Sequence, residues 1–361
     1  MNTRPAPLSE LPADNEVTAA GPSWPEVQPT TNLQLDLMVQ HHLTGPTESD
    51  HAFGHLEVLA KQLACIQHSD QSLQNIRFEA PQLVVFAADH GIADEGVSAF
   101  PQEVTKQRAL ALLTGKSHVN ALADLHGFAV TLVDAGVGSH IQLPPDTEAA
   151  VPLLLRKIGY GTRNMVITQA MSVAQARAAI VAGMDVVRHL PGNVVALSNI
   201  GVAGNASAAQ LLSRLCGVPL ADACGKDMAQ DEVRAQRKLE RLFAAASRHR
   251  KATAPLDVLA AMGGFEIAML CGAILQAASE RRVVLLDGFV AGAAALVARS
   301  LVPASTDYMV FAQRSAEPGH RLLLIHMQAT PLLDMNLRTG QGAGALLAWP
   351  LLLAAQRLIE R

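Results

Sequence analysis

Three glycines surround a single polar side chain near the end of the chain. Gly340, Gln341, Gly342 and Gly344 occur together directly before an apolar run. Glycines let a backbone turn tightly and approach a ligand closely, and a helix that starts after them offers free N–H groups to an anion. The pattern predicts that Gln341 points from a tight turn into a pocket. The alternative is a plain glycine-rich loop that only caps a helix.

A carboxylate and an imidazole follow an apolar run in the first third of the chain. Residues 83–88, LVVFAA, are typical of a buried parallel strand, and Asp89 and His90 come directly after it. In open α/β sheets ligands bind beyond the carboxyl ends of the strands. Asp89 and His90 are therefore candidate catalytic residues. The alternative is that both side chains only form hydrogen bonds within the loop.

Two further strand ends carry residues that suit a phosphate. Residues 194–197 lead into SNIGVAGNAS, which contains Gly201, Gly204 and Asn205, and a predicted helix over 208–216 follows. A strand, a glycine-rich turn and a helix can hold a phosphate at the helix N-terminus. The spacing is not G-x-G-x-x-G, so a dinucleotide fingerprint and an NAD-dependent oxidoreductase are disfavoured.

The last predicted strand, residues 308–311, is followed by a basic and a hydroxyl side chain. Arg314 and Ser315 stand just beyond its carboxyl end, where they suit a phosphate or a ribose. Together with Gly342 and the turn after the strand at 194–197, they predict one phosphate and ribose site.

The composition favours a soluble cytoplasmic protein. Half of the 361 residues are hydrophobic and only 4% are aromatic, so the core must be mainly aliphatic. The net charge of −4 argues against nucleic acid or an anionic membrane as a partner. The four cysteines lack metal-site spacing, which predicts no metal site and fits a reducing compartment. We expect no signal peptide and no membrane-spanning helix.

Strands alternate with helices from about residue 80 to 330, which predicts an α/β fold with a mainly parallel, doubly wound sheet. We expect residues 1–31 to form a disordered leader. Helices in 32–75 would form a small helical subdomain, 76–330 the α/β domain with the active-site loops, and 331–361 the catalytic-type loop with a final helix that packs on the small subdomain.

Several long motifs resemble one enzyme family. The run VVFAADHGIADEGVSAFPQEVTKQ, the short segments GTRN, MGGFE and LDGF, and the C-terminal RSAEPGH and PLLDMNLRTGQGAGALLAWPLL are similar to segments of nicotinate-nucleotide:dimethylbenzimidazole phosphoribosyltransferases. The resemblance covers roughly residues 45 to 360. It implies transfer of a phosphoribosyl group from nicotinate mononucleotide to dimethylbenzimidazole or a related base, which gives α-ribazole phosphate and nicotinate for cobalamin. It implies no cofactor, small-molecule substrates and a homodimer, with a paralogue as an alternative partner.

The resemblance also assigns roles. Ser98, Phe100 and Gln107 fall in the segment that binds the aromatic base, and Gln341 stands where the family has its catalytic Glu. An amide can form a hydrogen bond with an azole but cannot accept its proton. Asp89, His90, Glu95 or water are then the candidates for a substitute base.

Two other segments depart from the family pattern. Asn199 stands where the family has a Glu, and the match is poorest over 219–240, where the register of the basic residues is open. Two hypotheses follow. The chain is an active phosphoribosyltransferase, or it is a catalytically impaired homologue that binds base or nucleotide or serves as a partner subunit. The sequence leaves the preferred aromatic base open.

Overall fold

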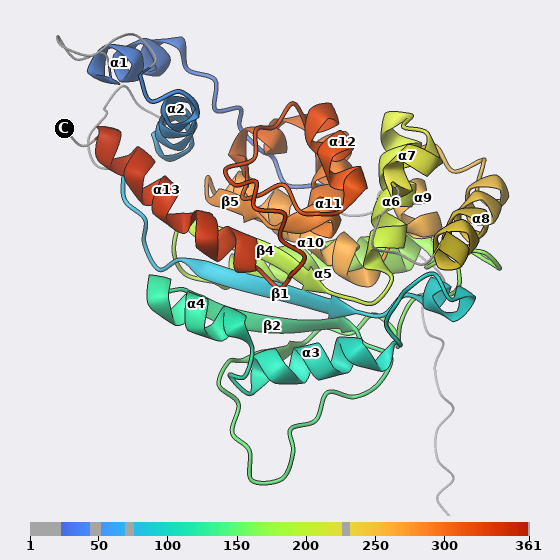
Figure 1. Ribbon diagram of the computed structural model, residues 1–361. Helices are drawn as coiled ribbons and strands as arrows, with labels where there is room; N and C mark the ends of the chain where they lie inside the picture. Colours follow the sequence, from blue (N-terminus) through green and yellow to red (C-terminus); the bar gives the residue numbers. More distant parts are fainter. Residues whose placement is uncertain (1–22, 44–51, 69–75, 226–231, 360–361) are drawn as a thin grey trace, which may run out of the picture.

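The computed structural model describes residues 23–43, 52–68, 76–225 and 232–359. These residues form one six-stranded sheet surrounded by helices (Figure 1). The strands are β1 (Gln82–Ala88), β2 (Ala129–Gly136), β3 (Leu153–Leu155), β4 (Val194–Ile200), β5 (Val283–Leu286) and β6 (Met309–Phe311). The α-helices are α1 (Leu33–Leu43), α2 (His55–Gln67), α3 (Glu103–Leu113), α4 (His118–His126), α5 (Val173–Arg188), α6 (Gly204–Cys216), α7 (Leu220–Cys224), α8 (Glu232–Arg248), α9 (Pro255–Met262), α10 (Phe265–Ser279), α11 (Gly288–Leu301), α12 (Pro318–Met327) and α13 (Ala343–Ile359).

All the strand pairs are parallel, and the strand order is β3-β2-β1-β4-β5-β6. Every residue of β1 is buried because helices cover both faces of the sheet, so the strand reads as a continuous apolar run. The chain leaves β1 toward β2 and later returns to the other side of β1 as β4. The strand order therefore reverses between β1 and β4, and loops at their carboxyl ends open a crevice there. The predicted fold class is confirmed.

The helices form two layers. α3 and α4 pack on one face of the sheet, and α5 and α10 pack on the opposite face (Figure 1). α5 and α10 cross at two glycines, because a Cβ on Gly183 would lie 1.9 Å from the carbonyl oxygen of Met269, and a Cβ on Gly272 would lie 1.8 Å from that of Ile180. The two helix backbones are therefore in direct contact, which brings α10 and its N-terminal turn close to the ends of β1 and β4.

The helices from the two ends of the chain pack together. α13 runs alongside α2, and α1 lies on both of them (Figure 1). This is the small helical subdomain that the sequence predicts. α13 also contacts α4 and β4, so the turn that precedes it is brought to the carboxyl end of the sheet.

The expected leader divides into two parts. Residues 1–22 lie outside the described residues. Residues 23–31 run against the body, where Tyr308 Oη donates a hydrogen bond to the carbonyl of Gln28 at 2.7 Å and the N–H of Thr30 donates to Asp307 at 2.9 Å. The chain therefore contacts the fold before residue 32, and the domain boundary at 31 stays a prediction.

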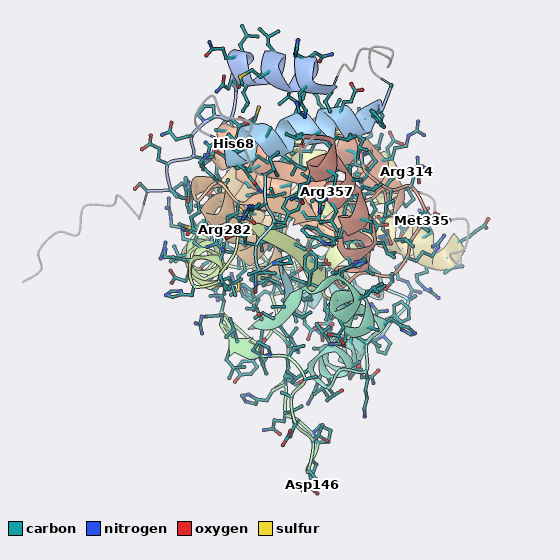
Figure 2. All side chains as sticks on the ribbon, turned by 90° about the vertical axis from the view of Figure 1, so that its left-hand side faces the viewer. His68, Asp146, Arg282, Arg314, Met335 and Arg357 are labelled. Atoms are coloured by element: carbon teal, nitrogen blue, oxygen red, sulfur yellow. The ribbon has the colours of Figure 1, made fainter. Side chains whose placement is uncertain are left out.

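Two other segments complete the description. The connection between β2 and β3 projects away from the body, with Asp146 at its tip (Figure 2). In the poorly matched region, α7 and α8 flank residues 226–231, which lie outside the described part of the chain. Within that part, no helix is both long enough and apolar enough to cross a membrane.

Candidate active site

A cavity of about 130 Å³ lies at the carboxyl ends of β4, β5 and β6. Its wall comes from segments that are far apart in the sequence: α3, the β4–α6 turn, the start of α11, the β6–α12 loop and the turn before α13. The lining residues are Arg108, Asn199, Ile200, Gly201, Asn205, Asp287, Gly288, Phe289, Val290, Ser315, Glu317 and 337–341. The cavity borders the place where the strand order reverses, which is where α/β sheets bind their ligands.

Gln341 lies in the turn before α13 and lines this cavity. Its backbone is in the left-handed region, with φ of 68°, and Gly342 follows with φ of 100°. Gly342 is packed so closely that a Cβ there would lie 2.5 Å from Leu83 Cδ1. The Ser117 hydroxyl at the start of α4 donates a hydrogen bond to Gln341 Oε1 at 3.2 Å. The positive φ angles and the close packing therefore restrict the backbone of this turn. The hydrogen bond from the start of α4 holds the Gln341 side chain.

Three of the predicted phosphate and ribose residues meet in the cavity. Gly201, Asn205 and Ser315 all line it. Gly201 must lack a side chain, because a Cβ would lie 2.7 Å from the carbonyl oxygen of Ala88. α6 begins at Gly204, directly after this turn, and Asn205 in its first turn lines the cavity. The geometry suits an anion beside hydroxyl and amide groups.

The other predicted residues of this group have different surroundings. Arg314 lies at the surface in Figure 2, and its guanidinium pairs with Asp334 through Nε at 2.9 Å and Nη2 at 2.6 Å. Arg314 and Gly342 are not among the residues that line the cavity. The N–H of Gly342 donates instead to Asp287 Oδ2 at 3.0 Å.

His90 and Asp89 lie beneath the β4–α6 turn rather than in the cavity wall. His90 is fully buried, with Nε2 2.6 Å from Glu266 Oε1 and Nδ1 3.0 Å from Ser207 Oγ. Burial disfavours the imidazolium, but Glu266 and Asp89 raise the pKa of His90 above its ordinary value. Asp89 accepts the N–H of Gly138 at 2.7 Å, and burial raises the pKa of its carboxyl. Both groups are tied into buried hydrogen bonds that hold the loops.

None of the residues predicted to bind the aromatic base lines the cavity, but Phe100 contacts Arg108, which does. Ser98 Oγ accepts the N–H of Phe100 at 3.1 Å, and the Phe100 ring is 52% exposed. The Arg108 guanidinium lies 5.0 Å from the centre of that ring and also lines the cavity. Gln107 is exposed on α3 next to it. An apolar ring and a cation beside a cavity suit a flat heteroaromatic ligand.

Comparison with known proteins places this geometry in a family. A family model described as phosphoribosyltransferase matches residues 29–361. The chain belongs to this phosphoribosyltransferase family. It is 45% identical over 340 residues to the nicotinate-nucleotide–dimethylbenzimidazole phosphoribosyltransferase of Cupriavidus taiwanensis, a match that covers 93% of this chain and 95% of that protein. It is 46% identical over 308 residues, 84% of each chain, to the Ralstonia nicotianae protein of the same name.

A solved structure shows the same fold. The crystal structure of CobT from Thermus thermophilus superposes with a TM-score of 0.82 at 33% sequence identity, covering 90% of this chain and 96% of that one. At this identity and coverage, the agreement extends through the sheet and its surrounding helices. The chain is thus a member of the phosphoribosyltransferase family in sequence and in fold.

Sequence reasoning missed the four charged residues that line the cavity of this phosphoribosyltransferase. Arg108 and Arg338 bring positive charge, and Asp287 and Glu317 bring carboxylates. Glu317 precedes α12 at its N-terminus. Both carboxylates stand within motifs that follow predicted strands, so their positions were a usable signal. Arg108 had none, because only the packing of α3 brings it to the site.

A hydrogen bond in the β6–α12 loop requires a neutral imidazole. Nδ1 of His320 accepts from the N–H of Ser315 at 3.0 Å and from its hydroxyl at 2.9 Å. Burial and the nearby Arg314 lower the pKa of His320 to about 4. Since an imidazolium cannot accept, protonation would break the contact with the N–H of Ser315, a residue of the cavity wall, and only the hydroxyl contact could persist by reversing its direction.

We therefore expect the protein to lose stability as pH falls from 6.5 toward 4. In that window the unfolded state binds a proton at His320 and the folded state does not, so the loss approaches about 1.4 kcal/mol per pH unit. Urea denaturation across these pH values should show a shallower decline for His320→Gln. His326→Gln, an exposed change on the same helix, should follow the wild type. Equal slopes for all three proteins would contradict this role.

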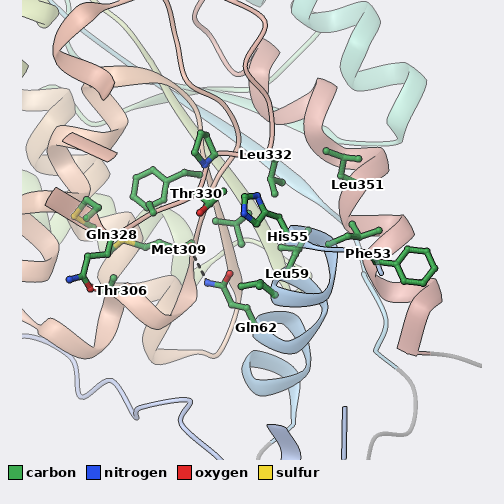
Figure 3. Close-up of a pocket in the computed structure, with 17 residues that line it drawn as sticks. Phe53, His55, Leu59, Gln62, Thr306, Met309, Gln328, Thr330, Leu332 and Leu351 are labelled. Carbon is green, nitrogen blue, oxygen red and sulfur yellow. Dashed lines mark hydrogen bonds between the residues drawn. The ribbon is translucent and has the colours of Figure 1, made fainter. Parts of the chain in front are cut away.

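A second and larger cavity has a different character. It encloses about 640 Å³ between α2, β6, α12 and α13 (Figure 3). Its walls are mainly apolar, and its Gln62 amide is engaged by the carbonyls of Asp307 and Met309 at 3.0 and 2.9 Å. None of the predicted site residues lines it. A phosphoribosyl group needs polar and charged partners, so the smaller cavity is the better candidate despite its size.

The described residues contain neither a cluster of three metal-ligand side chains nor a thiol with a lowered pKa. In that part of the chain no group of three or more His, Cys, Asp or Glu side chains gathers to hold a metal ion. Burial raises the pKa of the Cys65 and Cys224 thiols to about 11, so both are protonated near neutral pH.

Proposed function

We propose that this chain transfers the phosphoribosyl group of nicotinate mononucleotide to 5,6-dimethylbenzimidazole or a related aromatic base. The products are α-ribazole 5′-phosphate and nicotinate, and the reaction serves assembly of the cobalamin nucleotide loop. The observation that carries the proposal is the match to proteins of that name along nearly the whole chain, with a polar cavity at the expected edge of the sheet.

The reaction exchanges one bond at the anomeric carbon for another. A ring nitrogen of the base attacks this carbon as the bond to the nicotinate nitrogen breaks, and nicotinate leaves with the electron pair. The base then loses its N–H proton. The protein has to hold the two reactants in line, and this positioning can lower the barrier by several kcal/mol. It also has to provide an acceptor for the proton.

The cavity residues divide these tasks. We assign Gly201, Asn205, Ser315 and the N-terminus of α6 to the phosphate and ribose, because Gly201, Asn205 and Ser315 line the same cavity and provide amide and hydroxyl groups beside the start of that helix. The Phe100 ring with Arg108 provides a surface for the base. Gln341 lines the same cavity, and its amide can form a hydrogen bond with the ring nitrogen of the base. As an amide it does not take the proton, which passes to water or to another group.

The remaining parts of the proposal rest on the resemblance to the family. We propose a cytoplasmic enzyme that needs no cofactor and acts as a homodimer. The catalytically impaired homologue is the competing function, and the observation in its favour is the amide at position 341. It predicts binding of both substrates without turnover.

Ligand linkage tests the substrate site separately from turnover. Nicotinate mononucleotide should raise the melting temperature, because a ligand that binds only the native state stabilises it by about 2.7 kcal/mol at one hundred times its dissociation constant. Ser315→Ala should reduce this shift, and Ser247→Ala, on α8 outside the cavity wall, should not. No shift at millimolar ligand would count against the site.

Turnover is tested in a steady-state assay. Purified protein, nicotinate mononucleotide and dimethylbenzimidazole are incubated together, and α-ribazole 5′-phosphate is separated by chromatography. Product that increases with enzyme concentration supports the transferase. Ligand-induced stabilisation by both substrates without product would favour the impaired homologue.

A further inference from the structure

The turn that carries Gln341 is anchored from beneath by one buried carboxylate. Asp287 stands directly after β5 and is 2% exposed. Its Oδ2 accepts the N–H of Gly342 at 3.0 Å and the N–H of Gly344 at 3.3 Å. Its Oδ1 accepts the side-chain amide of Gln313 at 2.6 Å. Three donors therefore converge on one carboxylate, and two of them belong to the turn.

This carboxylate does not cap the helix that follows it. Asp287 is the residue before α11, yet its side chain forms no capping hydrogen bond with that helix. It binds instead the first N–H groups around the start of α13, more than fifty positions further along the chain. The side chain thus connects the end of β5 to the start of another helix. Such a contact is specific to the tertiary structure, and local helix propensity does not explain it.

The Asp287 carboxylate and its neighbours pack closely against the backbone at Gly342 and Gly344. A Cβ on Gly344 would lie 2.3 Å from Asp287 Oδ1 and 2.4 Å from Gln313 Nε2. A Cβ on Gly342 would collide with Leu83. Gly344 therefore has to lack a side chain for the carboxylate to reach its N–H group, and Gly342 has to lack one because Leu83 is in contact with it. Displacement of the Asp287 carboxylate would remove two hydrogen bonds from the backbone next to Gln341, which could then change its conformation.

We propose that Asp287 is a positioning residue that sets the place of the Gln341 side chain in the cavity, through its hydrogen bonds to Gly342 and Gly344. The catalytic consequence rests on the proposed function, and the structural part does not. Misplacement of a reacting partner by about 1 Å can lower a rate by about 10²-fold. The buried N–H donors also stabilise the ionised carboxylate, which offsets the rise in the pKa of Asp287 that burial causes.

The chain offers a matched control at the same edge of the sheet. Asp134, near the end of β2, is 1% exposed and accepts the N–H of Val137 at 2.9 Å and the Lys157 ammonium at 3.0 Å. It is a buried strand-end aspartate that holds a loop, but that loop does not carry Gln341. Asp287→Leu and Asp134→Leu both remove a buried acceptor of similar size. A general loss of stability is expected in both variants. Loss of the hydrogen bonds to the turn that carries Gln341 is expected only in Asp287→Leu.

Hydrogen exchange of residues 338–346 in the full chain tests whether Asp287 holds the turn, and this measurement does not require enzymatic activity. We expect exchange of this segment to accelerate at least ten-fold in Asp287→Leu and to stay at the wild-type rate in Asp134→Leu. Asp287→Asn should be close to the wild type, because its amide oxygen can still accept the two N–H groups. If Asp287→Leu proves too unstable to purify, Gly344→Ala disrupts the same contact from the other side. Unchanged exchange in Asp287→Leu or Gly344→Ala, or equal acceleration in Asp134→Leu, would overturn the proposal.

Kinetics test the catalytic consequence. Asp287→Leu should lower kcat by about 10²-fold, with the KM for nicotinate mononucleotide within three-fold of wild type, and Asp287→Asn should restore most of kcat. A loss confined to KM would overturn the positioning role. A further outcome is that all of the proteins bind substrate and yet form no product, while hydrogen exchange of residues 338–346 is still faster in Asp287→Leu than in Asp134→Leu. That result would support the structural role of Asp287 and contradict the proposed function.

Discussion

Replacing Gln341 with glutamate is expected to raise kcat by about 10²-fold or more, which is the usual contribution of a well-placed general base. The two side chains have nearly the same shape, and the Ser117 hydroxyl that donates to Gln341 Oε1 can donate equally to a carboxylate. The left-handed backbone at this position is already tolerated with a side chain. The change therefore adds a proton acceptor and little else, so the affinity for the base should hardly move.

The pH dependence gives this prediction a second signature. The gain should appear as pH rises through the pKa of the new carboxyl, because only the ionised form accepts a proton. Steady-state rates from pH 5 to 9 would measure it. Gln328→Glu is a suitable control, since Gln328 also has a positive φ and lies outside the smaller cavity. It should leave kcat unchanged.

A wild type already as fast as the glutamate variant would show that another group takes the proton. Asp89, His90 and Glu95 are the candidates from the sequence. Glu95 Oε1 accepts from Asn164 at 2.7 Å and its Oε2 lies 3.1 Å from Arg241, and His90 is fully buried. Among the described residues that line the cavity, Asp287 and Glu317 are the carboxylates. Glu317→Gln would then be the first variant to measure, because Glu317 is less buried than Asp287.

Gly272→Ala is expected to destabilise the fold by about 3 kcal/mol, at the upper end of the usual effect of overpacking. The added methyl would lie 1.8 Å from a backbone oxygen of α5, so no side-chain rotation can relieve the contact. The two helices would have to separate, and both are buried against the sheet or each other. Urea denaturation should show a lower midpoint.

Gly292→Ala provides the control for this change. It is also a helical glycine in a buried position, but its nearest neighbours are the side-chain carbons of Leu323, the closest at 2.8 Å. A side chain can move aside, and alanine gains about 1 kcal/mol of helix propensity over glycine. We expect a stability close to the wild type. Equal destabilisation by both changes would contradict backbone contact as the cause.

The sheet could be predicted because its strands carry strong local signals. The apolar runs at 83–88, 129–134, 194–197, 283–286 and 308–311 all fall within or overlap observed strands. β3 was missed because it is only half-buried, whereas β6, which is equally short and also lies at an edge of the sheet, is fully buried. α3, α4, α7, α9 and α12 were not predicted, although the capping box of α4 and the proline at the start of α9 and of α12 were usable signals.

The candidate site could be predicted only where chemistry and strand ends coincide. Gln341, Gly201, Asn205 and Ser315 meet in one cavity because each follows a strand or a glycine turn. The partner of His90 could not be predicted, since Glu266 is 176 positions away and reaches it only through the contact of α10 with the sheet. The local sequence also gives no indication that Arg314 pairs with Asp334.

A single-turnover reaction tests the central claim most directly. Wild-type protein is mixed in excess over nicotinate mononucleotide with saturating dimethylbenzimidazole, and the products are separated by chromatography at successive times. The account predicts complete conversion to equal amounts of α-ribazole 5′-phosphate and nicotinate, slower than with Gln341→Glu. Intact mononucleotide recovered from both proteins, under conditions where each binds both substrates, would contradict it.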